Sequence, residues 1–314
     1  MNTYKKLMGN SIIFAIGNLG SKLITFLLLP LYTHYLTTNE YGLVDMVTTT
    51  TSLLLPILSA NIFEAVLRFA LDKEEDKQKV LSNSLFVAVI GVILTLLTTF
   101  VLNYFIVNKK ILVYIIVILI LQIYRSIFSQ FARAINKVKL FAVDGIIMTF
   151  VTAIANIILL TIFHLGIDGY LISLVIANLI SILFLMLVMR VWKFINFSKI
   201  DRGYSKEMLL YSVPMIPNSI MWWLISAANR YFILFFIGPS ANGIFAAANK
   251  IPSIVNIFST IFGQAWQMSA IEEGNNEEKG KFYSNVFSFY SSGLFIVTAG
   301  IIMIYEISSG SCVL

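Results

Sequence analysis

The chain has 314 residues, of which 58% are hydrophobic and 12% are charged, with a formal net charge of +6. Its mean hydropathy is +0.86. About a quarter of the residues in an average soluble domain are charged, so this composition excludes a disordered chain, a disulfide-stapled scaffold and a soluble globular domain. A lipid bilayer is the solvent that suits such a sequence.

Nine apolar runs are long enough to cross a bilayer, since a transmembrane helix needs about 20 mainly apolar residues. The sequence therefore predicts an all-α multi-pass membrane protein with about nine transmembrane helices. The approximate spans are 9–31, 41–63, 80–102, 111–131, 143–163, 167–189, 209–237, 243–265 and 286–305.

The cations cluster in alternate loops between these runs. With the N-terminus in the cytoplasm, 16 Lys and Arg residues fall inside and only Lys109 and Lys110 fall outside. Cytoplasmic loops carry an excess of positive charge. We therefore expect a membrane protein with a cytoplasmic N-terminus, a lipid bilayer as its surroundings and no nucleic-acid partner.

Motifs for catalysis or metal binding are missing from the sequence. It contains no HExxH, no P-loop, no GxSxG and no dinucleotide fingerprint. The single cysteine, Cys312, permits no internal disulfide and no cysteine-based metal site. A membrane polymerase or glycosyltransferase would normally carry a long extramembrane loop, and none is predicted. We expect a protein that is not an enzyme, with no cofactor and no metal.

A faint internal repeat links two of the predicted spans. Residues 39–44 open the second span, residues 240–245 open the eighth, and the offset is 201 residues. This offset covers six helices, an even number, so the two units would be parallel in the membrane. It predicts an N-terminal six-helix bundle over 1–200 and the first three helices of a second bundle over 201–314. On this repeat the chain looks C-terminally truncated.

Four cations lie inside predicted spans: Lys22, Arg125, Arg230 and Lys250. Each costs about 2.5–3.5 kcal/mol at the bilayer centre, so such residues usually face a bundle interior or an aqueous cavity. Two other placements stay open, namely snorkelling to an interface and pairing with a carboxylate, such as Asp45 with Lys22.

Polar side chains form stripes on the first, second, seventh and eighth spans, which are equivalent pairs under the repeat. Such stripes line a central cavity or hold helices together. The predicted cavity-lining and gating residues are Asn18, Thr25, Asp45, Asn229, Asn249, Ser253 and Asn256. Because the buried charges are mostly positive, the cavity would suit an anion such as a lipid-linked pyrophosphate, held by Lys22, Arg230, Lys250 and Arg125.

Several short stretches carry a family resemblance, and those in the second half are the more distinctive. They are Gly17–Lys22, Pro30–Thr33, Glu40–Asp45, Pro214–Asn218, Asn229–Phe232, Asn242–Phe245, Ala248–Pro252 and Gln264–Gln267. With them, essentially the whole chain resembles the polysaccharide repeat-unit flippases of the multidrug/oligosaccharidyl-lipid/polysaccharide exporter superfamily.

The resemblance implies two six-helix bundles around a V-shaped central cavity. It also implies alternating access that moves an undecaprenyl-pyrophosphate-linked sugar unit from the inner to the outer leaflet, with polysaccharide polymerase and glycosyltransferases as partners. Relatives often carry an acidic residue before the arginine of the seventh span, where this chain has Asn229. That departure puts ion coupling at this position in doubt.

The function that we expect is flipping of a lipid-linked oligosaccharide for capsule, O-antigen or exopolysaccharide synthesis. Two alternatives stay open. A cation-coupled drug antiporter of the same superfamily would favour intramembrane carboxylates, of which Asp45 is the clearest candidate. An inactive truncated remnant would transport nothing.

Overall fold

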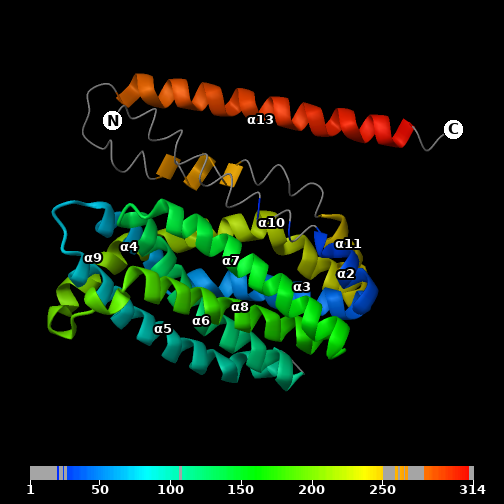
Figure 1. Cartoon of the computed structure of the whole chain (residues 1–314), viewed down its shortest axis with the longest axis horizontal. Helices are drawn as coiled ribbons and strands as arrows, with labels where there is room; N and C mark the ends of the chain where they lie inside the picture. Colours follow the sequence, from blue (N-terminus) through cyan, green and yellow to red (C-terminus); the bar gives the residue numbers. More distant parts are fainter. Residues whose placement is uncertain are drawn as a thin grey trace. The chain divides into compact units, whose positions relative to one another are not determined.

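A computed structural model describes Gly20, Ile24 and residues 27–105, 108–249, 259–260, 262–264, 266–267 and 279–310. The chain forms two compact units, one of residues 20–248 and one of residues 1–19 with 249–314. The described part consists of helices and connecting turns, without strands (Figure 1), which confirms the all-α prediction.

Ten α-helices have their bounds among the described residues of the larger unit. They are α2 (Leu29–Tyr35), α3 (Thr38–Leu58), α4 (Ile62–Leu71), α5 (Lys77–Phe105), α6 (Lys109–Ala134), α7 (Val138–Ile157), α8 (Gly166–Met189), α9 (Arg202–Ser212), α10 (Ile216–Phe236) and α11 (Pro239–Ala248). Short turns of other helix types extend α7 at Ile158–Ile162, follow α8 at Val191–Lys193 and Phe197–Lys199, and join α9 to α10 at Val213–Met215.

Six segments among the described residues are long and apolar enough to span a membrane. They are Thr38–Leu58, Lys77–Val101, Lys109–Ala134, Val138–Ile162, Gly166–Met189 and Arg202–Phe236. Each overlaps one of the predicted spans, which confirms a multi-pass membrane protein. The first predicted span lies mostly, and the eighth partly, outside the described residues, so the count of nine stays a prediction.

The predicted spans 41–63 and 80–102 leave residues 64–79 as a loop, and this is wrong for its first half. The chain turns at Ala60 and Asn61, which both have positive φ, and α4 follows. Helix α4 has only ten residues, and it buries Ala65, Val66 and Leu67 against the core. A search for apolar runs of about 20 residues misses a helix of this length, because one face of it is polar.

The main hydrophobic core lies where α4, α5, α6, α8 and α9 meet. Its largest fully buried side chains include Leu67, Leu81, Ile123, Ile127 and Phe131. Many other apolar side chains on these helices are exposed, as on α5, where Phe100 and Tyr104 are more than 80% exposed. Apolar surface of this extent suits a protein whose outer face contacts lipid.

The smaller unit is described mainly through α13 (Lys279–Gly310), a helix of 32 residues that contains the ninth predicted span. Tyr290 of α13 donates a hydrogen bond to Ser259 Oγ at 3.1 Å. Its ring also stacks on Phe262 with centroids 4.1 Å apart. Ser259 and Phe262 therefore pack against α13.

Candidate functional site

A polar cluster joins α3, α10 and α11 within the larger unit. Arg230 Nη1 on α10 lies 2.7 Å from Asp45 Oδ1 on α3, and the same nitrogen lies 3.3 Å from Thr49 Oγ1. Asn242, in the first turn of α11, donates to Asp45 Oδ2 at 3.3 Å. One carboxylate therefore contacts side chains from two other helices.

The spacing of residues along α3 brings the side chains of this cluster to one face of the helix. Residues three and four apart share a face of a helix, and Asp45 and Thr49 point from α3 toward α10. Helix α10 contributes two more contacts to that face. The indole nitrogen of Trp223 donates to the Thr49 carbonyl at 3.0 Å, and the hydroxyls of Tyr231 and Thr50 lie 2.6 Å apart. These bonds hold α10 in register with α3.

Arg230 keeps spare hydrogen-bonding capacity at this site. Its side chain is 28% exposed, and that of Asp45 is 12% exposed. The Nε atom of Arg230 is buried and has no hydrogen-bond partner among the residues described. A guanidinium offers five donors in a planar fork. The geometry therefore leaves donors for an anion beside the ion pair with Asp45.

A second buried ion pair lies between α6, α7 and α8. Arg125 Nη2 lies 2.9 Å from Asp144 Oδ2, and Arg125 Nε donates to Ser181 Oγ at 2.7 Å. Ser181 in turn donates to the other oxygen of Asp144. Asp144 and Ser181 are fully buried. Both carboxylate oxygens are thus occupied by these two partners.

The predicted site residues are only partly brought together. Arg230 and Asp45 meet, whereas Arg125 lies with Asp144 in the other cluster. Asn229 is exposed beside Arg230, and Asn249 is half-buried in the smaller unit. The remaining predicted residues lie outside the part of the chain that the structure describes: Lys22, Lys250, Asn18, Thr25, Ser253 and Asn256.

Sequence reasoning overlooked Asp144 and Ser181. Asp144 stands at the start of the predicted span 143–163, where a charge resembles an ordinary span boundary. The structure begins α7 at Val138, so Asp144 lies within the membrane-spanning helix. Arg125 itself indicates that such a residue exists, because a cation within a membrane span usually pairs with a carboxylate. A search for that carboxylate could have found Asp144.

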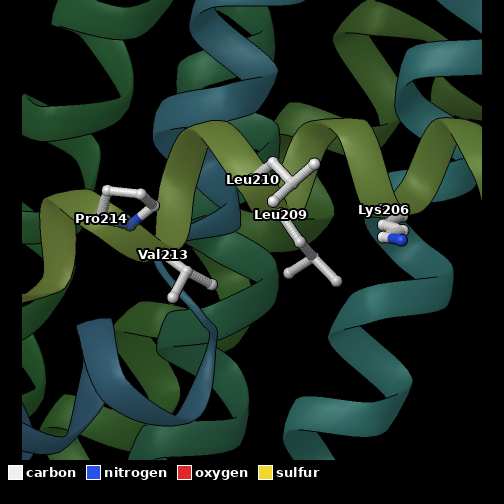
Figure 2. A pocket seen from close by; sticks show the side chains of 5 residues that line it. All are labelled: Lys206, Leu209, Leu210, Val213 and Pro214. Carbon is white, nitrogen blue, oxygen red and sulfur yellow. The ribbon is translucent and has the colours of Figure 1, made fainter.

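No cluster of three or more His, Cys, Asp or Glu side chains suited to a metal occurs in the described ranges. A shallow groove of about 230 Å³ runs along α9, lined by Lys206, Leu209, Leu210, Val213 and Pro214 (Figure 2). Its lining is almost entirely carbon, and it contains none of the predicted site residues. The groove therefore adds no support to the predicted anion site.

The family profile described as polysaccharide biosynthesis protein matches residues 7–267. No curated protein matches the chain. Among solved structures, similar folds include the MATE multidrug transporter DinF-BH, at a TM-score of 0.76 and 15% identity over 96% of this chain and 75% of that one.

Two further structures share this fold at similarly low identity. A MATE transporter in complex with MaL6 matches at a TM-score of 0.76 and 15% identity, covering 98% of this chain and 73% of that one. An outward-facing MATE family transporter of the MOP superfamily matches at 0.73 and 14%, covering 97% and 72%. At such identities the likeness shows the fold.

The match to the family profile covers most of the chain. The MATE transporter structure aligns with nearly the whole of this chain. Both findings agree with the buried charges between membrane-spanning helices. The chain therefore belongs to the polysaccharide biosynthesis protein family, and its fold is similar to that of MATE transporters.

Proposed function

We propose that this protein flips a lipid-linked oligosaccharide, carried on undecaprenyl pyrophosphate, from the inner to the outer leaflet of the bacterial cytoplasmic membrane by alternating access. Support for this cargo comes from the family, since its members are described as polysaccharide biosynthesis proteins. A glycan carried on pyrophosphate is an anion with a long apolar tail, so the carrier needs positive charge within the membrane.

The observation that carries the proposal is the environment of Arg230. Its guanidinium lies between membrane-spanning helices, and its Nε has no hydrogen-bond partner among the described side chains and backbone. A planar guanidinium binds phosphate oxygens through two parallel N–H donors. Asp45 neutralises the arginine, and phosphate oxygens would take over part of that role.

Three further cations complete the proposed anion site. Lys22 and Lys250 would add point charges to the pyrophosphate, because both lie on predicted spans that carry polar stripes. Arg125 is proposed with a weaker basis, because Asp144 and Ser181 already occupy its guanidinium. Partners that supply and consume the lipid-linked unit would be glycosyltransferases and a polysaccharide polymerase.

Complementation of a bacterial strain that lacks its own repeat-unit flippase tests the function. Arg230→Ala should lower surface polysaccharide at least about tenfold, because about 1.4 kcal/mol of lost binding corresponds to that factor. Arg230→Lys should keep partial activity, since it retains the charge without the fork. Arg202→Ala is the matched control, because this arginine is exposed at the start of α9.

Membrane levels of every variant are measured alongside, so that loss of protein is not read as loss of transport. Lys22→Ala and Lys250→Ala should behave like Arg230→Ala. Normal polysaccharide in the Arg230→Ala strain, at equal protein level, would refute the role of this arginine. A wild-type chain that complements no flippase-null strain would refute the cargo.

A cation-coupled drug antiporter is the second candidate, favoured by the similarity to MATE multidrug transporters. For that activity the carboxylate of Asp45 would carry a cation or a proton. Expression should then raise resistance to a cationic dye such as ethidium, and Asp45→Asn should abolish the effect. A flippase without drug transport leaves dye resistance unchanged.

A further inference from the structure

Helix α9 has two different faces, and one of them lines the shallow groove of Figure 2. The inner face is buried and contains Tyr204, Ser205, Met208 and Ser212. The outer face continues into the turn after α9 and carries Lys206, Leu209, Leu210 and Val213. These four residues follow one another at i, i+3, i+4 and i+7, the spacing of a single stripe along a helix.

The groove is charged at one end and apolar along the rest. Lys206 stands nearest the start of α9, and every lining residue beyond it is apolar (Figure 2). The side chain of Leu210 is 67% exposed, and that of Val213 is 44% exposed. A ligand that matches this groove therefore has an apolar chain and a negatively charged end.

The groove lies where the chain enters the bilayer. Helices α9 and α10 belong to one stretch, Arg202–Phe236, that is long and apolar enough to span a membrane. A lysine at the start of such a stretch keeps its ammonium at the level of the lipid phosphates, while its methylene groups contact acyl chains. Lipid acyl chains are therefore the apolar groups that reach Leu209, Leu210 and Val213.

The chain around the groove is positively charged. Residues 190–208 contain five cations and two carboxylates. Arg190, Lys193 and Lys206 take part in no salt bridge among the described residues. Basic groups beside a membrane helix attract anionic lipid headgroups. A lipid phosphate would supply the counter-charge that no described side chain gives to Lys206.

We propose that this groove binds one anionic glycerophospholipid of the adjacent leaflet, with the headgroup phosphate on the Lys206 ammonium and an acyl chain along Leu209, Leu210 and Val213. The distribution of cations predicts that this leaflet is the cytoplasmic one. Acyl chains are as apolar as the leucine side chains, so the headgroup decides which lipid is held. A zwitterionic headgroup brings a cation of its own beside Lys206, and an anionic headgroup does not.

Photocrosslinking tests which lipid occupies the groove. The full chain is placed in phosphatidylcholine nanodiscs with a trace of a probe lipid that carries a diazirine on one acyl chain. The probe is phosphatidylglycerol in one sample and phosphatidylcholine with the same chains in the other. Peptide mass spectrometry locates the crosslinks. Phosphatidylglycerol should label residues 209–214 about fivefold more, as expected for one lysine beside an anionic headgroup.

Substitutions of Lys206 test the headgroup contact. Lys206→Glu should abolish the preference for phosphatidylglycerol, because the cation is replaced by an anion, whereas Lys206→Arg should keep it. Lys139→Glu is the matched control, since Lys139 is an exposed lysine in the first turn of α7. This control should leave labelling of residues 209–214 unchanged. Gel filtration checks that each variant is folded.

A second variant tests the acyl-chain part of the groove. Val213→Trp fills the groove with a bulky ring, so labelling of residues 209–212 by both probes should fall severalfold. Val188→Trp is the matched control, because Val188 is 51% exposed on α8 and does not line the groove. Equal labelling in the two tryptophan variants would contradict an acyl chain in this groove.

The remaining outcomes separate a lipid from other occupants. Equal labelling by the two probes in the wild type, or a preference that survives in Lys206→Glu, would overturn the site. Labelling by neither probe would mean that protein covers the groove, which also overturns it. Excess glycerophosphate should displace no probe, since it lacks an acyl chain, and displacement would indicate a site for free phosphate instead. The groove contains none of the residues proposed to bind the cargo, so these results do not depend on the proposed function.

Discussion

Arg125 and Arg230 each meet a carboxylate from another helix, although the sequence left open whether these cations bind a ligand. Burying a lone charge in hydrocarbon costs several kcal/mol, and a partner removes most of that cost. The two pairs differ in setting. Asp144 is 1% exposed with both oxygens bonded, whereas Asp45 and Arg230 are part-exposed with a donor to spare. The first pair suits structure and the second suits ligand exchange.

Breaking the ion pair between Arg125 and Asp144 should therefore destabilise the protein. Asp144→Leu leaves Arg125 buried without its anion, and we expect a loss of about 3–5 kcal/mol. The readout is the apparent Tm in detergent by size-exclusion chromatography after heating. The double change Asp144→Leu with Arg125→Met should recover much of the loss, because it removes both charges.

The exposed pair of Lys110 and Asp168 provides the control for this comparison. Lys110 is 70% exposed in that pair, so Lys110→Met should change the apparent Tm little. An Asp144→Leu protein as stable as the wild type would mean that the buried pair contributes nothing.

At the surface, the Lys199–Asp76 pair links two loops at 2.5 Å. The hydrogen bond from Lys199 lowers the pKa of Asp76. A lowered pKa adds stability above the unfolded value of about 3.9, and that stability is lost as the pH falls through the folded pKa. The Tm difference between wild type and Asp76→Asn should therefore shrink between about pH 5 and about pH 3.

At neutral pH, Lys199→Met should lower the Tm as much as Asp76→Asn does. The double variant should have a Tm only a little lower than that of either single variant. A Tm difference that grows as the pH falls would reverse the predicted sign. Because both side chains are more than a third exposed, the effect should be modest.

Among the elements, α5 anchors the segment that joins α8 to α9. The amide of Asn83, which is fully buried on α5, makes four hydrogen bonds. Its nitrogen donates to the carbonyls of Lys79 and Lys199, and its oxygen accepts from Asp201 N and Ser205 Oγ. These bonds fix where α9 begins, and α9 leads through Pro214 into α10 and Arg230.

Asn83→Ala should cost at least about 2 kcal/mol, because it leaves buried backbone groups without partners. Asn103→Ala is the matched control on the same helix, since Asn103 is exposed. The measurement is the apparent Tm, with protease cleavage near residues 199–201 as a local readout. Equal cleavage rates in the two variants would rule out an anchoring role.

For the whole molecule, the distribution of cations predicts the orientation in the membrane. The described helices place Ser198 and Asn108 in exposed connections. Single cysteines there should react with an impermeant maleimide from opposite sides, Ser198→Cys from the cytoplasm and Asn108→Cys from outside. Labelling of both from the same side would contradict the positive-inside assignment.

The amino-acid sequence predicts the bilayer as solvent, the membrane helices and most of their positions, because hydropathy and helix length depend on neighbouring residues. It also predicts Arg230 and Asp45 as site residues, but it offers Lys22, which lies outside the described residues, as the partner of Asp45. The contact of Asp45 with Arg230 is visible only in three dimensions, since the two residues are 185 positions apart in the chain. The same is true of the close approach of Gly42 to Gly243. Such pairings follow from how helices pack against one another. The pattern of residues along one helix does not show which distant helix it will contact.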